Sequence, residues 1–158
     1  HLFLELADAF PETEFRLVGP PGQDESYHRE IEASVSKRGN VSYEGVVDPD
    51  RIHDYYRNAI AVVNTSSFEG FPNTFIEAWR VGTPVLSLDV DPNRFVDTDE
   101  IPFADGDFKV LEQHIERLLT DDEYCLRATA EASEYVNQNL DVSRVGAKFG
   151  GVLRNAIK

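Results

Sequence analysis

The sequence predicts an α/β domain: a Rossmann-like parallel sheet with helices on both faces, followed by a helical run at the C-terminal end. Short apolar segments alternate with segments of roughly 10 to 16 residues that have helical periodicity, which is typical of parallel strands joined by helices. The central apolar segments are continuous rather than alternating, as in strands covered on both faces. The 158 residues fit one domain with a single core. Right-handed crossovers between the strands then place helices on both sides of the sheet.

The first half of the chain is predicted to form three helices and two strands. Pro11 ends the first helix, and Gly39 ends the second. A Gly-Pro-Pro-Gly turn at 19–22 closes the first strand. Asp48 is predicted to cap the third helix, with Pro49 at its first position. The predicted helices cover 1–10, 24–39 and 48–59, and the predicted strands cover 15–20 and 41–47.

The second half is predicted to contain two buried strands and four helices. A short helix between these strands begins with Asn73 as its N-cap. Phe75 and Trp79 lie four positions apart on this helix, so they are predicted to face the core together. The predicted buried strands are 60–66 and 84–90, a short edge strand is predicted at 101–105, and the helical run covers 107–121, 122–140 and 141–158.

The composition excludes several classes of function. A net charge of −14 and a pI near 4.5 argue against nucleic-acid binding through a basic surface. No apolar run reaches the roughly 18 residues of a membrane span, which leaves only surface association of a longer parent protein with a membrane. The histidines lack metal-ligand spacing, so no metal site is expected. Cys125 is the single cysteine, which excludes an intramolecular disulfide and favours a reducing, cytoplasmic setting.

The excess of acids has two explanations. Four lysines among fifteen basic residues, with abundant acids, are typical of halophilic proteins that work in molar salt, but an ordinary acidic protein is an equal alternative. In both cases most of the charge is expected to be solvated surface. The chain begins with His1 and lacks methionine, so we expect a trimmed piece of a longer protein.

The segment SSFEGFPNTFIEAWRVGTPV, residues 66–85, has the strongest functional pattern. Glu69 and Glu77 lie eight positions apart and flank a small turn at the start of the predicted helix. The free N–H groups at 73–76 and the helix dipole favour an anion such as phosphate, and Gly70 lets the backbone approach a ligand. Glu77 is placed to accept hydrogen bonds from sugar hydroxyls. The spacing alone slightly favours a plainer interpretation, in which both glutamates are solvated surface acids.

The longer segment SSFEGFPNTFIEAWRVGTPVLSLDVDP resembles the donor-binding half of the family 4 glycosyltransferases, which are retaining enzymes of the GT-B fold. Their frame is S-x-x-E-G-F, then a second glutamate followed by alanine, then G-x-P-V. The similarity extends over nearly the whole chain, including the strands EFRLVGP and VSYEGVV and the closing helices. The matched residues are Ser66, Glu69, Gly70, Phe71, Glu77, Ala78, Gly82, Pro84 and Val85.

The resemblance implies that the longer parent protein is a glycosyltransferase of the hexosyltransferase type, with this chain as its C-terminal domain. The donor would be a nucleoside-diphosphate sugar, with no cofactor and no metal required for transfer. Glu69 would be the catalytic residue facing the donor sugar, and Glu77 would bind the ribose. The acceptor, a glycan, a lipid or a small molecule, would bind through an N-terminal domain. That domain and the first strand are absent here, so the fragment alone would be inactive. The other donor-binding positions would be Gly70, Phe71, Pro72, Asn73 and Thr74 in the diphosphate turn, with Gly45 and Val46 beside the base.

Other features of the sequence limit the resemblance or leave alternatives open. Many relatives have a Gly-Gly turn where this chain has Asp91-Pro92-Asn93. The Asp-x-Asp pattern at Asp89 and Asp91 is uninformative, because aspartates are so frequent in this chain. The pair Tyr55-Tyr56 is predicted to be packing. The alternative functions are a GT-B sugar-nucleotide epimerase or phosphorylase, and a non-catalytic Rossmann-like binding module.

Overall fold

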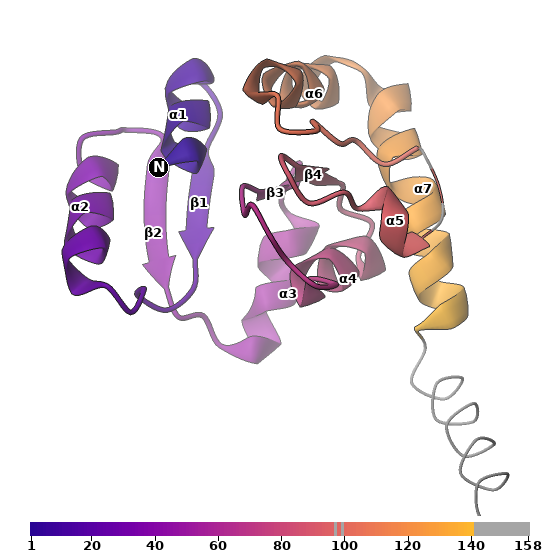
Figure 1. Ribbon diagram of the computed structural model, residues 1–158, viewed down its shortest axis with the longest axis horizontal. Helices are drawn as coiled ribbons and strands as arrows, with labels where there is room; N and C mark the ends of the chain where they lie inside the picture. Colours follow the sequence, from indigo (N-terminus) through magenta and orange to yellow (C-terminus); the bar gives the residue numbers. More distant parts are fainter. Residues whose placement is uncertain (97, 99, 141–158) are drawn as a thin grey trace, which may run out of the picture. The chain divides into compact units, whose positions relative to one another are not determined.

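The computed structural model describes residues 1–96, 98 and 100–140, so the helix predicted over 141–158 lies outside the described residues. The chain divides into two compact units, His1–Tyr55 and Tyr56–Lys158. Each unit contains a pair of parallel strands with helices packed against them (Figure 1). The predicted α/β class is therefore confirmed. None of the helices in the described part of the chain combines the length and hydropathy that a membrane span requires.

The first unit is built around strands β1 and β2. They pair in parallel, with Phe15 opposite Val41, and the register shifts by one residue between Leu17 and Val18. Asp24 caps the second helix by accepting hydrogen bonds from the backbone N–H groups of the next turn. The elements are α1 (Leu2–Ala9), β1 (Phe15–Val18), α2 (Glu25–Val35) and β2 (Val41–Gly45). Helix α3 (Pro49–Arg57) follows, and Asp48 precedes it as predicted.

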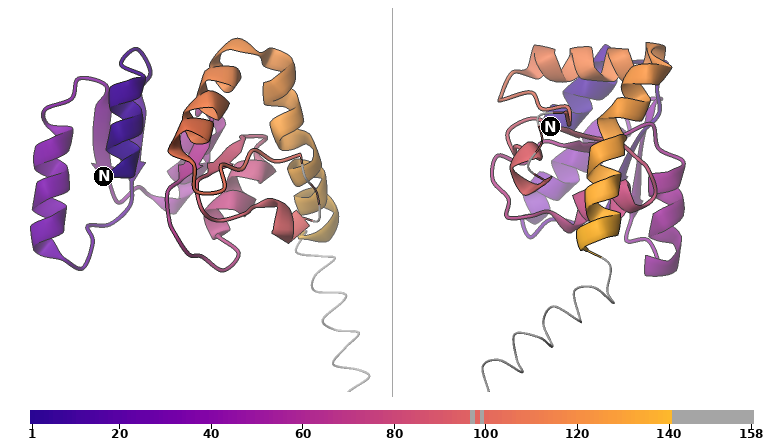
Figure 2. Two further views of the ribbon diagram at one scale, coloured as in Figure 1. Left: turned by 45° about the horizontal axis from the view of Figure 1, so that its top comes forward. Right: turned by 90° about the vertical axis from the view of Figure 1, so that its right-hand side faces the viewer.

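The second unit is built around strands β3 and β4. They pair in parallel from Val62 opposite Val85 to Asn64 opposite Ser87. A single parallel bridge between Ser87 and Phe103 is the observed form of the predicted edge strand. The elements are β3 (Val62–Asn64), α4 (Asn73–Arg80), β4 (Val85–Ser87), α5 (Asn93–Val96), α6 (Phe108–Thr120) and α7 (Asp122–Asn139). Figure 2 shows α6 and α7 meeting at an angle, where Asp121 is the C-cap of one helix and the N-cap of the next.

The core of the second unit forms where α4 packs against α7 and the two strands. Phe75 and Trp79 are fully buried there, with ring centroids 5.6 Å apart, as their spacing predicted. Ser133 of α7 donates a hydrogen bond to the carbonyl of Trp79 at 2.8 Å, which ties the two helices together. The buried cluster consists of Phe75, Ala78, Trp79, Val85, Val90, Ile101, Ala132 and Val136.

Two details differ from the sequence predictions. Asn73 is not the N-cap of α4: Pro72 occupies that position in an extended conformation, and no side chain caps the helix. Proline fixes its own φ near the value found here, −66°, so the helix begins one residue earlier than predicted. The strand predicted at 60–66 is shorter and only partly buried, because β3 pairs with one neighbour, β4, within the described residues.

Candidate functional site

The loop between β3 and α4, residues 65–72, leaves the sheet at the carboxyl end of β3. Asn64 directs the chain outward, because its side-chain oxygen accepts a hydrogen bond from the N–H of Ser66 at 3.0 Å. The carbonyl of Asn64 meanwhile accepts from Leu88 and so stays within the sheet. Parallel α/β folds bind ligands in loops at this end of their strands. The predicted site residues from Glu69 to Thr74 therefore follow the carboxyl end of β3, the end at which such folds bind ligands.

The beginning of α4 presents backbone donors to solvent. Asn73 and Thr74 are both exposed, and no side chain in the described part of the chain caps the helix. The N–H of Phe75 is already used, since it donates to the carbonyl of Pro72 at 3.1 Å. The first two N–H groups of the helix, those of Asn73 and Thr74, therefore remain the ones available to an anion, and the helix dipole reinforces them.

Aromatic packing fixes the turn before α4. The ring of Phe71 stacks on Phe95 with centroids 4.6 Å apart and an interplanar angle of 10°. Phe71 also lies 6.2 Å from the ring of Trp79, and Pro72 is buried. The side chain of Phe71 thus anchors the turn in the core, and only its backbone is free to serve a ligand.

Glu69 and Gly70 lie in the exposed part of the loop. The preceding residue, Phe68, is 90% exposed. A Cβ built on Gly70 would meet nothing within 4 Å, and its φ lies outside the left-handed region. Neither packing nor backbone conformation in the free chain therefore requires a glycine at this position. A glycine there leaves room for a ligand to approach the backbone closely.

Glu77 lies one turn into α4 and is partly buried. Its Oε2 accepts a hydrogen bond from the hydroxyl of Tyr56 at 2.8 Å. Burial raises the pKa of Tyr56 well above its ordinary value, and the hydrogen bond and charge of Glu77 add to this effect. Sequence reasoning treated Tyr56 as packing and missed this contact, because the two residues lie 21 positions apart and no local pattern connects them.

The other two predicted site residues, Gly45 and Val46, lie in the first unit. Gly45 ends β2 with a φ of 66°, a left-handed conformation that favours glycine. Val46 follows it and is 74% exposed. An exposed apolar side chain beyond the carboxyl end of a strand suits contact with a planar base.

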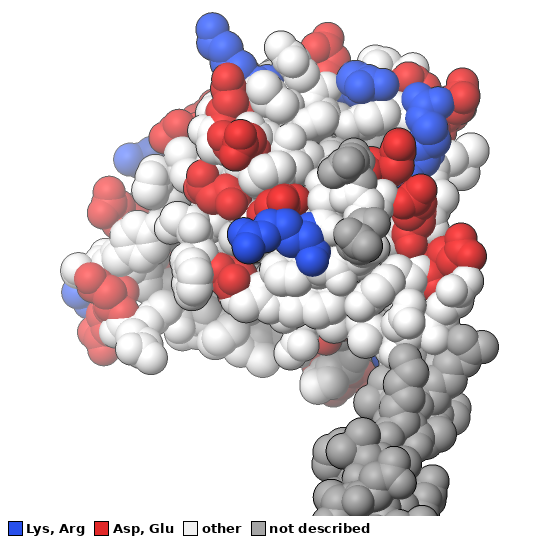
Figure 3. All heavy atoms as spheres, turned by 45° about the vertical axis from the view of Figure 1, so that its right-hand side comes forward, with Lys and Arg blue, Asp and Glu red and all other residues white. Residues whose placement is uncertain are grey.

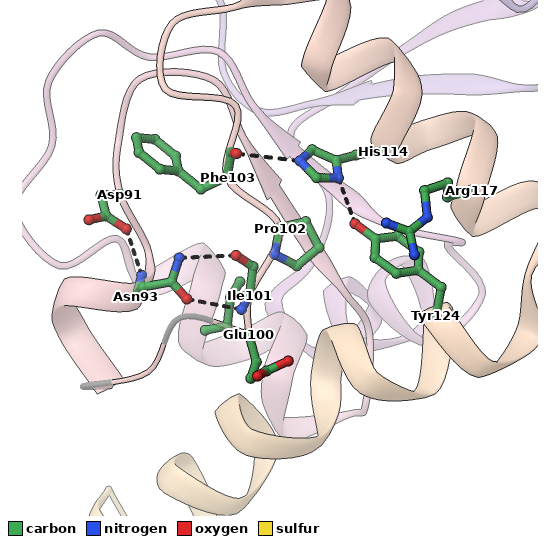
Figure 4. Close-up of a pocket in the computed structure, with 9 residues that line it drawn as sticks. All are labelled: Asp91, Asn93, Glu100, Ile101, Pro102, Phe103, His114, Arg117 and Tyr124. Atoms are coloured by element: carbon green, nitrogen blue, oxygen red, sulfur yellow. Dashed lines mark hydrogen bonds between the residues drawn. The ribbon is translucent and has the colours of Figure 1, made fainter.

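A cavity of about 400 Å³ in the second unit lies elsewhere, lined by residues between Asp91 and Tyr124 (Figure 4). Several of its polar side chains are engaged with the protein. The amide of Asn93 exchanges two hydrogen bonds with the backbone of Ile101, at 3.0 and 2.9 Å. His114 Nδ1 lies 2.6 Å from the Tyr124 hydroxyl, and Nε2 lies 3.3 Å from the carbonyl of Phe103. We therefore interpret this cluster as a brace between α6, α7 and the segment at 101–103.

The local charge offers an anionic ligand little attraction from side chains. Between residues 66 and 84 the charged residues are Glu69, Glu77 and Arg80. Arg80 lies at the far end of α4 and is exposed. Acidic side chains are spread over the molecular surface, as the face in Figure 3 shows. A phosphate at this site would depend on backbone dipoles.

Comparison with known proteins identifies the family of this chain. The family described as "Glycosyl transferases group 1" matches residues 2–121, which include every predicted site residue. The chain belongs to this family. A curated relative, glycosyltransferase 1 domain-containing protein 1 of Xenopus tropicalis, is 25% identical over 142 residues. That match covers 87% of this chain and 40% of the relative.

Solved glycosyltransferase structures share the fold. Sucrose-phosphate synthase from Thermosynechococcus elongatus matches with a TM-score of 0.81 at 24% identity, covering 99% of this chain and 41% of that one. HepE from Anabaena, in complex with UDP and glucose, matches with a TM-score of 0.78 at 18% identity, covering 95% of this chain and 44% of that one. This group 1 glycosyltransferase chain therefore has the GT-B fold and spans less than half the length of these relatives.

Proposed function

We propose that this chain is the C-terminal, donor-binding domain of a retaining family 4 glycosyltransferase and that it binds a nucleoside-diphosphate sugar. The observation that carries the proposal is the arrangement of α4. Its N-terminus is exposed and uncapped, and Glu77 lies one turn further along the same helix. Residues four apart share a helix face, so Glu77 follows Asn73 along one side of α4. An anion site and a sugar-hydroxyl acceptor thus lie on one element.

Each part of the donor has a residue suited to it. The diphosphate accepts hydrogen bonds from the N–H groups of Asn73 and Thr74, and the ribose hydroxyls donate to Glu77. Glu69, on the exposed loop, faces the donor sugar and orients it or stabilises positive charge during transfer. The leaving nucleotide keeps its diphosphate on the helix end, so the charge that develops there is stabilised by fixed dipoles without a metal ion.

The family match and the ligands of the neighbours support this proposal. HepE has been solved with UDP and glucose, and also with UDP-glucose. Both alternatives from the sequence, an epimerase or phosphorylase and a non-catalytic module, are less well supported, because the matching family is one of glycosyl transferases. This chain covers only 40% of the curated relative and 44% of HepE, so each of these proteins is more than twice as long as the part that matches. We propose that the acceptor, a glycan, a lipid or a small molecule, binds a further N-terminal domain.

Ligand-observed NMR on the 158-residue chain tests donor binding. UDP, GDP, ADP and CDP with their sugar conjugates are titrated in high salt, against the wild type and Glu77→Ala. One nucleotide is expected to bind, with about tenfold or greater loss in the variant, the scale of a hydrogen bond to a charged group. Glu116→Gln, an exposed glutamate on α6, is the matched control. Unchanged affinity in Glu77→Ala would contradict the ribose role.

A transfer assay tests the catalytic part of the proposal. The chain alone is expected to transfer no sugar, whereas the longer protein that contains it transfers sugar and loses this activity with Glu69→Gln. A binding measurement on the same variant separates the two roles, because a catalytic glutamate affects transfer more than nucleotide affinity. Robust transfer by these 158 residues alone would refute the requirement for a second domain.

A further inference from the structure

We propose that Tyr56 is a positioning residue for nucleotide binding, whose hydroxyl holds the Glu77 carboxylate in the orientation that accepts the ribose hydroxyls. The inference rests on the proposed function, because it assigns a partner to the glutamate that binds the ribose. Tyr56 itself need not contact the nucleotide. It acts through Glu77 by fixing one of the two carboxylate oxygens.

The contact is direct and well placed. The hydroxyl of Tyr56 donates to Glu77 Oε2 at 2.8 Å, and both side chains are partly buried. The ring of Tyr56 packs against the cluster that contains Phe75 and Trp79, so the position of its hydroxyl is set by the core. A hydrogen bond from a packed ring restricts the rotamers of a glutamate that would otherwise be free.

The backbone of Tyr56 is fixed as well. Its carbonyl oxygen accepts from the Thr83 hydroxyl at 2.7 Å and from the N–H of Ala59 at 3.0 Å. Thr83 is only 3% exposed and lies in the turn between α4 and β4. The last turn of α3 is thereby tied to the end of the helix that bears Glu77. The Tyr56 hydroxyl and the Glu77 carboxylate are therefore held at a fixed separation, which makes their hydrogen bond persistent.

The bond leaves Glu77 able to serve a ligand. An ionised carboxylate has about four acceptor sites on its two oxygens. Tyr56 occupies one of these sites, on Oε2. Burial also raises the pKa of Tyr56, so the phenol keeps its proton and remains the donor. The carboxylate is therefore held in a fixed direction before the ribose arrives, and less side-chain entropy is lost on binding.

The test compares nucleotides with and without the ribose hydroxyls. Affinities of the 158-residue chain for UDP, GDP, ADP and CDP, and for the 2′,3′-dideoxy counterpart of each, are measured by NMR titration. The variants are Tyr56→Phe, Glu77→Ala and both together, and Tyr55→Phe is the control. Tyr55 is the adjacent tyrosine of α3, and its hydroxyl donates to Glu44 at 3.4 Å instead. Phenylalanine keeps the ring of Tyr56 and removes only the hydroxyl.

We expect Tyr56→Phe to weaken binding of the preferred ribonucleotide about threefold to tenfold, the range of one hydrogen bond, and to leave the dideoxy counterpart unchanged. In the Glu77→Ala background, the further change Tyr56→Phe should leave the affinity unchanged. Tyr55→Phe should bind the nucleotides as the wild type does. Equal losses for both nucleotides in Tyr56→Phe would indicate a merely structural role and overturn the inference.

The outcomes also separate this inference from the function on which it rests. If Glu77→Ala abolishes the preference for the ribonucleotide while Tyr56→Phe preserves it, the proposed function stands and the inference is wrong. If the wild type binds none of the four nucleotides, or does not distinguish them from their dideoxy forms, the ribose role of Glu77 is wrong and the inference falls with it.

Discussion

Replacing Phe71 by alanine is expected to destabilise the second unit and to weaken nucleotide binding, because this side chain anchors the turn that precedes α4. Phe71 is partly buried, so we expect about half of the 3–5 kcal/mol that a buried Phe→Ala change costs. The stacked contact with Phe95 at 4.6 Å adds about 0.5–1.5 kcal/mol. Together these contributions predict a loss of about 2–4 kcal/mol in the free energy of unfolding.

Trp79 provides the assay. It is the single tryptophan of the chain, fully buried, and 6.2 Å from the ring of Phe71, so its fluorescence reports unfolding of this unit in urea. A double-mutant cycle with Phe95→Ala should give a coupling energy of about 1 kcal/mol for the stacked pair. Phe71→Leu, which retains apolar volume, should lose less than Phe71→Ala. A change below about 0.5 kcal/mol in Phe71→Ala, the level of an ordinary surface substitution, would refute the anchoring role.

Three further predictions concern pH, packing and salt. Burial chiefly lowers the pKa of His114 below the ordinary value of 6.5, the charge of Arg117 lowers it further, and the carbonyl of Phe103 opposes both. As the pH falls, the unfolded chain therefore protonates His114 before the folded chain does, so the free energy of unfolding should decrease as the pH drops below 6.5. In a plot of urea midpoint against pH, His114→Gln should flatten this decrease. His53→Gln, at an exposed site, should leave the decrease in place. Asn93→Ala should cost about 1–3 kcal/mol in urea unfolding, because it removes both hydrogen bonds to the backbone of Ile101, and an unchanged midpoint would exclude a bracing role. Raising NaCl from about 0.1 to 1 M should strengthen nucleotide binding, because it shortens the Debye length from about 10 to 3 Å and screens the net charge of −14; weaker binding in salt would point to attractive ion pairs instead.

Local chemistry made most of the secondary structure predictable. Asp24 and Asp107 cap α2 and α6 through their side chains, and such caps are visible in the sequence. The apolar spacing of Phe75 and Trp79 identified the buried face of α4. Asn73 misled the prediction of the helix start, because Pro72 beside it already has the extended conformation of an N-cap. Helix α5 was not anticipated: the side chain of Asn93 bonds to Ile101, eight positions away, and propensity contains no signal for that contact.

In the candidate site, too, the features contained in a local motif were predictable and the long-range contacts were not. The turn and both glutamates follow from one contiguous motif, and the structure places the turn and Glu69 on the loop after β3 and Glu77 in the helix that follows. The partner of Glu77 could not be predicted, because Tyr56 reaches it across the fold from α3. The role of Phe71 was also ambiguous in the sequence: a residue of a binding turn can face the ligand or the core. Its stacking on Phe95 shows that the side chain faces the core.

The uncapped start of α4 has a cost for the free protein. A capping side chain at a helix start typically adds about 1 kcal/mol of stability, and Pro72 provides none. Under the proposed function, the ligand's phosphate accepts hydrogen bonds from this helix end, so the substrate provides the cap that the free protein lacks. Screening for heat-resistant variants would therefore favour an acid or a hydroxyl at position 72, which would occupy the same N–H groups that hold the phosphate. Thermostability gained at that position should come at the expense of donor affinity, a trade-off between resilience and activity.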